Sequence, residues 1–255
     1  MLHRKLLVAV AGVILCLGLS GCATYSCGGP SGGHCYATVS WGKGDLQETD
    51  FRGFLTVLTP VQLNKGNLVI NDELWLYQQG TNTCGLGACW AEVGVTSGAC
   101  STGSDTRYFW ADNTPAGFIC RDLGPVQPQE FGQPTMLVIA RLINQTDAFE
   151  VDIEPCSRID GVNVPCPRRP MTHVSFGNPM QPNVATIGTE LGGSSGANAP
   201  PATFTENWHP DHFFAGAWVT TTGSPQVQTP PLQGSWTVNP SVQTEGGTWT
   251  TSCCQ

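Results

Sequence analysis

After residue 34, short apolar runs alternate with clusters of Gly, Pro, Asn and Ser along the chain. Residues 149–153 (FEVDI) give the clearest pattern, because apolar and acidic side chains follow one another with a period of two. That period is typical of a β-strand with one buried face. No long segment has the 3.6-residue period of an amphipathic helix. The pattern therefore predicts an all-β protein.

The predicted strands are rich in β-branched and aromatic residues and are bounded by turn residues. They lie at residues 35–41, 54–58, 67–70, 73–77, 90–95, 107–110, 136–142, 149–153, 203–205, 216–220, 234–238 and 247–250. About ten to thirteen strands in one chain favour an antiparallel two-sheet β-sandwich of the jelly-roll or concanavalin-like type. Residues 155–182 and 192–201 are dense in Pro, Gly and polar residues, so loops are expected there.

Residues 1–21 have the composition of an export signal. Two basic residues, Arg4 and Lys5, precede an uncharged apolar run that extends from Leu6 to Leu19. The run is shorter than the ~20 apolar residues that a transmembrane helix needs, and it is typical of a secretory signal peptide. We therefore expect the mature protein to lack this segment.

The end of this signal, LSGC at residues 19–22, resembles a bacterial lipobox. In a lipobox the cysteine is lipidated and becomes the new N-terminus, so we predict a lipid anchor at Cys22 and a place in the bacterial cell envelope. Residues 22–34 are small and Gly-rich and predict a flexible tether. A single β-sandwich domain is expected at residues 35–255. The alternative is ordinary cleavage near Gly21, which would give a secreted protein.

The chain contains 12 cysteines, of which Cys16 lies in the signal and Cys22 in the lipobox. An even number remains, as is typical of disulfides in an exported protein. These are Cys27, Cys35, Cys84, Cys89, Cys100, Cys120, Cys156, Cys166, Cys253 and Cys254. Structural zinc sites usually contain CxxC pairs and none occurs here, so we expect a sandwich stapled by disulfides. Cys156 and Cys166 are expected to close one loop.

Charge and composition exclude several classes of protein. Only 12% of the residues are charged and the net charge is −8, whereas nucleic-acid-binding proteins are usually basic. The chain has 8 Trp and 10 Phe, which argues against intrinsic disorder. We therefore expect no nucleic-acid partner, contact with the membrane through the lipid anchor alone, and a monomer.

The sequence lacks an HExxH motif and a Walker loop, and we expect neither a cofactor nor a metal ion. One candidate metal corner is HPDH at residues 209–212. Its proline prevents the helical geometry that would bring both histidines to one face. A solvated turn is the favoured interpretation of these four residues.

Two isolated glutamates are candidates for catalysis. Glu92 shares one face of a predicted strand with Trp90 and Gly94, because residues i and i+2 point the same way. A carboxyl group beside an indole, with open space at a glycine, has the raised pKa that acid–base chemistry requires. Glu190 lies among glycines that would let a ligand approach. Two such carboxyls on facing strands could share a proton and activate water. The alternative for Glu92 is an exposed position at the rim of a sheet.

Residues 90–113 (WAEVGVTSGACSTGSDTRYFWADN) resemble the core of the neprosin-like glutamic peptidases. In that family a Glu-x-Gly segment, here residues 92–94, precedes a Thr-Arg-aromatic stretch that ends in a Trp and an Asp, here residues 106–112. Residues 73–76 are similar to the family's preceding Ile-Trp strand. Residues 187–193 are similar to the segment that holds the second catalytic glutamate.

The resemblance implies an antiparallel β-sandwich in which Glu92 and Glu190 form the catalytic pair. It also implies hydrolysis of peptide bonds, at proline or more broadly. The aromatic and basic residues of these motifs are expected to bind the substrate: Trp75, Trp90, Arg107 and Trp110.

Functions of three classes fit the sequence. The first is an exported, lipid-anchored glutamic endopeptidase that hydrolyses peptide or protein substrates at acid pH. The alternative is a non-catalytic cell-surface module that binds a glycan or protein ligand, with Trp208, Trp218, Trp236 and Trp249 as candidate contacts. A glycosidase with two carboxylates ranks last, because the Glu-x-Asp-x-x-Glu signature of sandwich glucanases is absent.

Overall fold

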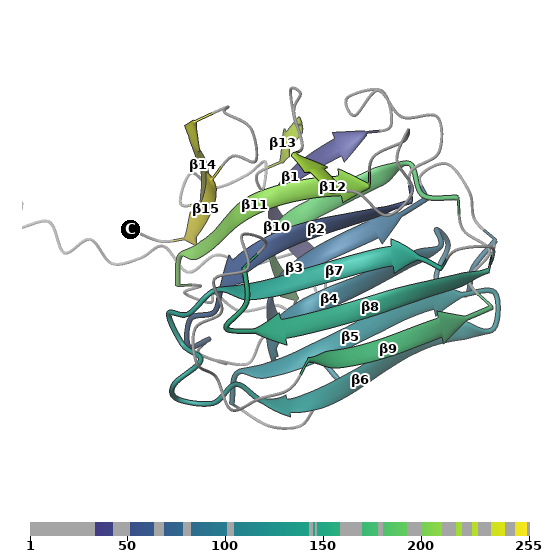
Figure 1. The fold of residues 1–255 in the computed structure, drawn as a ribbon, viewed down its shortest axis with the longest axis horizontal. Coiled ribbons are helices and arrows are strands. Elements are labelled where there is room, and N and C mark those ends of the chain that lie inside the picture. The colour runs from purple at the N-terminus through teal and green to yellow at the C-terminus, as the bar shows by residue number, and fades with distance from the viewer. Residues whose placement is uncertain are drawn as a thin grey trace, which may run out of the picture.

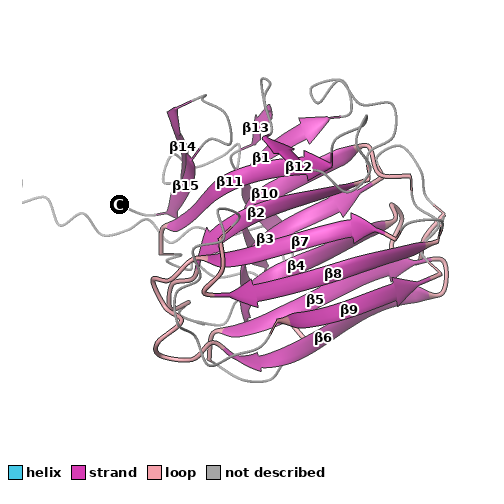
Figure 2. Cartoon of the chain, viewed as in Figure 1, coloured by secondary structure: helices cyan, strands magenta, loops and turns pink. Residues whose placement is uncertain are grey.

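The computed structural model describes most of the chain after residue 33. The described residues are 34–42, 52–63, 69–78, 83–100, 105–142, 145, 147–158, 170–177, 181–192, 200–210, 218–220, 226–228, 236–242 and 248–253. Within them, the chain forms two antiparallel sheets packed face to face and no helix (Figures 1 and 2). The expected antiparallel β-sandwich is confirmed. Cys22 and the predicted signal and tether up to residue 33 lie outside the described residues.

The first sheet has seven strands. From one edge to the other they are β13 (Gln226–Gln228), β1 (His34–Gly42), β10 (Val184–Gly192), β3 (Val69–Tyr77), β4 (Trp90–Ser97), β5 (Arg107–Thr114) and β6 (Gly117–Pro125). Strand β10 comes late in the sequence but inserts between β1 and β3. The order therefore places residues that are more than 100 positions apart in the sequence side by side in the middle of the sheet, such as Tyr36 and Glu190.

The second sheet lies in front of the first in Figure 1 and has eight strands. Their order is β14 (Trp236–Val242), β15 (Thr248–Cys253), β11 (Ala202–Pro210), β2 (Gly53–Thr59), β7 (Thr135–Arg141), β8 (Ala148–Pro155) and β9 (Met171–Phe176), and β12 (Trp218–Thr220) pairs with β11 outside this path. The core between the sheets is made of large apolar side chains from both layers, among them Phe54, Phe149 and Phe204 from this sheet and Leu74 and Ile187 from the first. Burying each such side chain stabilises the fold by roughly 1.5–3 kcal/mol.

Alternation divides the central strands of the first sheet into a core face and an outer face. On β3, Ile70, Leu74 and Leu76 point into the core. The residues between them, such as Asn71 and Trp75, therefore point to the outer face. The same parity holds for the neighbouring strands, so polar and aromatic side chains collect on one side of the sheet.

Disulfides staple the fold, as expected. Cys84 pairs with Cys89 and closes a tight loop before β4. Cys100 pairs with Cys120 and ties the end of β4 to the edge strand β6. Cys156 is also disulfide-bonded, while its expected partner Cys166 lies outside the described residues.

Several strands differ from the sequence predictions. Strand β10, which lies in the middle of the first sheet and carries Glu190, and the short edge strand β13 were not predicted, and β3 is one strand where two were expected. Strand β6 was not predicted, because it lies at the sheet edge with few buried positions and so has no clear alternation. Strand β9 lies within the stretch 155–182, where a loop was expected; Met171–Phe176 pairs with β8 instead. His209 lies in strand β11 and is buried, so the interpretation of residues 209–212 as a solvated turn is wrong at this position.

Candidate active site

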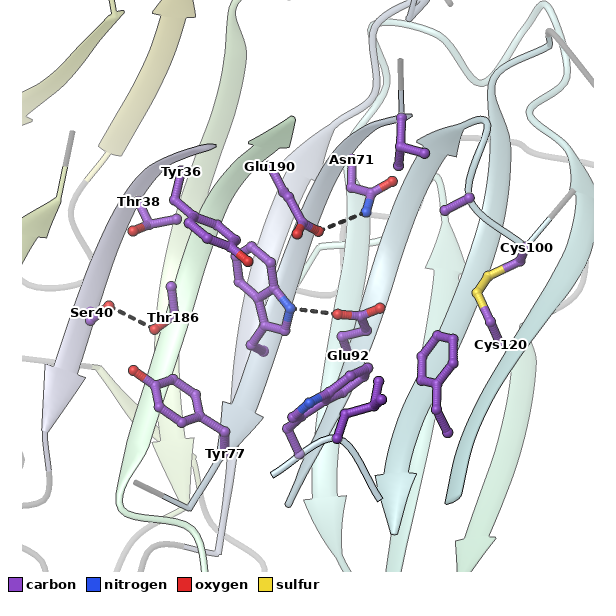
Figure 3. Close-up of a pocket in the computed structure, with 16 residues that line it drawn as sticks. Tyr36, Thr38, Ser40, Asn71, Tyr77, Glu92, Cys100, Cys120, Thr186 and Glu190 are labelled. Atoms are coloured by element: carbon purple, nitrogen blue, oxygen red, sulfur yellow. Dashed lines mark hydrogen bonds between the residues drawn. A yellow bond between two sulfur atoms is a disulfide. The ribbon is translucent and has the colours of Figure 1, made fainter. Parts of the chain in front are cut away.

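A pocket of about 750 Å³ opens on the outer face of the first sheet. Its floor is formed by β1, β10, β3 and β4, and the Cys100–Cys120 disulfide lies at its far side (Figure 3). Phe118 of β6 also lines the pocket. Glu92 on β4 and Glu190 on β10 both line this pocket. The structure therefore brings together the two glutamates that the sequence singled out. Their catalytic role stays a prediction.

Each of the two glutamates accepts a hydrogen bond from a side chain of β3, the strand between them. The indole nitrogen of Trp75 donates to Glu92 Oε2 at 2.5 Å, and Asn71 Nδ2 donates to Glu190 Oε2 at 3.0 Å. Thr96 Oγ1 in turn donates to Asn71 Oδ1 at 2.6 Å, which fixes the orientation of the amide. Strand register explains the pairing, because Glu92 lies opposite Trp75 and Glu190 lies opposite Asn71.

Both glutamates are nearly withdrawn from solvent but still reach the pocket, since each is 7% exposed. Burial raises the pKa of Glu92 well above its usual range, and the charge of Glu190 raises it further, while the hydrogen bond from Trp75 opposes the shift. The pair therefore keeps one proton at a pH at which two exposed carboxyl groups would both be ionised.

Tyr36 on β1 completes the polar floor beside Glu190. Burial raises the pKa of its hydroxyl, with further contributions from the charge of Glu190 and from a hydrogen bond with that carboxylate. The Tyr36 ring also meets Trp75 edge to face, with ring centroids 5.8 Å apart. The phenol therefore stays protonated and can act as a donor in the pocket.

A third glutamate, Glu73 on β3, lies on the same face as Glu92 and Glu190 but below the pocket surface. It has no exposed area, and it lies opposite Gly94 on one side and Gly188 on the other. Sequence reasoning missed Glu73, because an acidic residue in an alternating strand looks like part of an exposed face. The only hint in the sequence was Gly94, because a glycine inside a strand can mark a close approach of the neighbouring strand. Its meaning becomes clear only when Glu73 is known to lie opposite it.

Gly94 is required by the close approach of β4 to β3. A Cβ atom at this position would lie 2.2 Å from the carbonyl oxygen of Asp72 and 2.7 Å from Glu73 Cα. These are backbone atoms in the middle of a sheet and cannot move aside without breaking strand pairing.

Gly94→Ala is therefore expected to lower the free energy of unfolding by about 1–3 kcal/mol, as overpacked positions do. Urea denaturation at pH 5 measures this change. An unchanged denaturation midpoint would contradict the rigid spacing of β3 and β4.

Of the four residues that were expected to bind substrate, two line the pocket and two do not. Trp75 and Trp90 line the pocket. Arg107 is the first residue of β5 and does not line the pocket; its Nε is 2.7 Å from Asp122 Oδ2 in an exposed ion pair.

Trp110 lies on the core face of the sheet, where its ring stacks on His173 of β9 with centroids 3.6 Å apart. It therefore does not reach the pocket. The reason is the alternation of side chains along β5. Ala111 lies opposite Glu92 and shares its outer face, so the preceding residue, Trp110, points to the core face. Asp112, on the same face as Trp110, accepts a hydrogen bond from Ser175 of β9 and so helps to join the two sheets.

An apolar rim borders one end of the pocket, and sequence reasoning found only one of its three residues, Trp90. The rim consists of Leu86, Trp90 and Phe118. Leu86 and Phe118 are exposed, and the rings of Trp90 and Phe118 are in contact with centroids 5.6 Å apart. No Lys, Arg or His is among the described residues that line the pocket. The pocket therefore combines negative charge with apolar surface.

Of the four tryptophans considered as glycan contacts, only Trp208 has a described side chain, and it is half-buried on β11. The part of the chain that the structure describes holds no cluster of three or more His, Cys, Asp or Glu suited to a metal ion. It also contains no apolar helix of membrane-spanning length.

No protein-family model matches the chain, and no curated protein is significantly similar to it in sequence. Solved structures do match. One is scytalido-glutamic peptidase with a transition state analog inhibitor, at a TM-score of 0.55 and 11% identity over 86% of this chain and 98% of that chain. Another is the same peptidase with a peptide based transition state analog, at a TM-score of 0.51 and 10% identity over the same shares. The chain thus has a β-sandwich fold similar to that of a glutamic peptidase.

Proposed function

We propose that this protein is a glutamic endopeptidase that hydrolyses peptide bonds at acid pH with Glu190 and Glu92. The observation that carries the proposal is that two buried glutamates, each held by a side chain of β3, face one pocket. The similarity in fold to scytalido-glutamic peptidase supports the same reaction class. The finer resemblance to the neprosin-like branch is part of the proposal and rests on residues 73–113.

Glu190 acts as the general base and Glu92 as the general acid, since the charge of Glu190 helps to keep the proton on Glu92. Glu190 takes a proton from a water molecule as the water oxygen attacks the carbonyl carbon of the scissile bond. Glu92 donates its proton to the carbonyl oxygen, which gives a neutral tetrahedral intermediate. When that intermediate collapses, the C–N bond breaks, the proton on Glu190 passes to the leaving nitrogen, and the new carbonyl returns its proton to Glu92.

The substrate is an unfolded polypeptide with apolar or basic side chains near the scissile bond. The apolar rim of Leu86, Trp90 and Phe118 offers a surface for a large apolar side chain. The two carboxyls and the lack of a basic residue among the described lining residues disfavour acidic side chains. Export through the predicted signal and anchoring at Cys22, with a monomer facing protein substrates outside the cell, remain part of the proposal.

The proposal is tested with the purified mature protein and a denatured protein substrate between pH 3 and 7. New N-termini that appear with the wild type, and not with a Glu92→Gln/Glu190→Gln double variant, are the expected result. A peptide-based transition state analog should compete with the substrate. Equal hydrolysis by wild type and double variant would exclude this pair as the catalytic site.

Phe118→Ala is expected to raise KM for a peptide with a large apolar side chain by roughly 5–10-fold while kcat stays within twofold, because the rim contacts the substrate before and during the reaction alike. Initial-rate kinetics with matched Leu and Ala peptides measure the effect. Phe176→Ala is the control, since Phe176 is an exposed phenylalanine on β9 of the other sheet. An equal change in both variants would argue against a specific apolar subsite.

A further inference from the structure

Glu73 lies between the two glutamates of the pocket and is not explained by the mechanism above. Along β3 it lies opposite Gly188 of β10 and Gly94 of β4. Glu190 is two residues from Gly188, and Glu92 is two residues from Gly94, so both carboxyls are diagonal neighbours of Glu73 across the adjacent strands. Gly94 has no side chain next to Glu73, and a Cβ there would lie 2.8 Å from Glu73 Cβ.

The carboxyl group of Glu73 is fully buried, and among the described residues no N–H or O–H group donates to either of its oxygens. An ionised carboxylate in such a place would lose its hydration without compensation, which costs several kcal/mol. The titratable groups that face it are all acids or a phenol: Glu190 on β10, Glu92 on β4 and Tyr36 on β1, with Asp72 next to it on β3. The surroundings therefore strongly favour a neutral Glu73.

We propose that Glu73 is a positioning residue that stays protonated and donates its O–H to the carboxylate of Glu190. This inference rests on the proposed role of Glu190 as the general base. With the N–H of Asn71 on Oε2, the Glu190 carboxylate then has two donors from β3. A carboxylate with two donors is fixed in orientation, and its ionised form is stabilised.

One geometric observation agrees with this arrangement. Glu73 and Glu190 are diagonal neighbours on adjacent strands, and ionised carboxylates are acceptors only, so a hydrogen bond between the two groups requires a proton on one of them. Burial, the charges of Glu92 and Glu190, and a hydrogen bond with Glu190 all raise the pKa of Glu73. The functional consequence is that Glu190 remains a base at acid pH, where an isolated buried carboxylate would already be protonated.

The test compares Glu73→Gln with Glu73→Met by the pH dependence of kcat/KM for a peptide substrate. Glutamine keeps an N–H donor, so Glu73→Gln should stay within about threefold of wild type with the same acid limb. Methionine removes the donor, so Glu73→Met should lose about 10–100-fold, the effect of one charge-assisted hydrogen bond, and its acid limb should move up by about one pH unit. Asp72→Asn is the matched control. Asp72 directly precedes Glu73 on β3 and is equally buried, but it points into the core. The pH profile of kcat/KM for Asp72→Asn should match that of wild type.

A purely structural role predicts another result. If Glu73 only fills space, both variants should keep the wild-type acid limb, and that outcome overturns the inference. Equal impairment of Glu73→Gln and Glu73→Met also overturns it, because the donor would then not be the property that matters. Thermal unfolding at pH 7 serves as the folding check; Glu73→Met should be at least as stable as wild type, since it removes a buried acid.

A spectroscopic readout separates this inference from the proposed function. The infrared difference spectrum between wild type and Glu73→Gln at pH 7 should contain the C=O stretching band of a protonated carboxyl group. Absence of that band overturns the inference even if the protein is a peptidase. Presence of the band in a protein that hydrolyses no peptide would support the proton on Glu73 and contradict the proposed function instead.

Discussion

Glu190→Gln is expected to lower kcat for peptide hydrolysis by ~10³-fold or more, the largest catalytic effect of any single substitution in this pocket. Glutamine keeps the size of the side chain and can still accept the hydrogen bond from Asn71 Nδ2. It cannot take a proton from water, so the attacking nucleophile would not be activated. KM should change less than threefold, because the shape of the pocket and its apolar rim are retained.

Glu92→Gln should behave differently, and the contrast tests the assignment of base and acid. Its amide can still donate a hydrogen bond to the substrate carbonyl, but it cannot transfer a proton, so a loss of ~10²-fold is expected. The alkaline limb of the pH profile should also disappear, because in the wild type it reports loss of the proton from Glu92. Steady-state kinetics from pH 3 to 8 measure both variants. If Glu92→Gln loses the acid limb instead, the two roles must be exchanged.

Much of the fold can be predicted from the sequence, because buried strands carry a strong periodic pattern. Strands β4 and β8 were expected at nearly their observed bounds, since both alternate or are apolar throughout. The edge strands β6 and β9 were missed, as were the central strand β10 and the short strand β13. Strand β6 has few buried positions, and β9 follows a Pro-rich segment, so neither shows the pattern of a half-buried strand. Pairing with a neighbour, which holds them in place, is not visible in a single sequence.

Only those features of the site that depend on a single strand could be predicted from the sequence. Glu92 could be placed beside Trp90 by alternation within β4. That Trp75 would hold Glu92, and that Trp110 would point into the core, depends on which residues of β3 and β5 lie opposite, and register is set by tertiary packing. Glu73 illustrates the limit most clearly, because its surroundings come from β1, β10 and β4.

Asp72 gives the second large effect, on stability and not on activity. It points into the core, has no exposed area, and accepts one hydrogen bond, from Thr189 Oγ1 at 2.6 Å, while its Oδ2 has no partner among the described residues. Burial raises the pKa of Asp72 to about 7, although the hydrogen bond from Thr189 opposes the shift. The folded protein therefore binds a proton between about pH 4 and 7 that the unfolded chain releases.

The sign of the pH dependence follows from that difference. Because the pKa is higher in the folded state, the free energy of unfolding is greatest below about pH 4 and falls as the pH rises to about 7. Three pKa units correspond to roughly 4 kcal/mol at the alkaline end. The raised pKa values of Glu73 and Glu92 act in the same direction. The fold is thus expected to be most stable in the acid range where the proposed peptidase works.

Asp72→Asn should leave stability at pH 4 nearly unchanged and raise it at pH 8 by about 2–4 kcal/mol, or roughly 5–15 °C in Tm. Asparagine can still accept the hydrogen bond from Thr189, but it carries no charge that must be desolvated. Calorimetry at both pH values measures the difference. Glu130→Gln is the matched control, since the buried Glu130 carboxylate already accepts the backbone N–H of Gln127 at 2.7 Å and should bring no gain at pH 8. Equal stability of wild type at pH 4 and 8 would contradict this prediction. It would mean that Asp72 is solvated in the folded protein and does not make the fold more stable at acid pH.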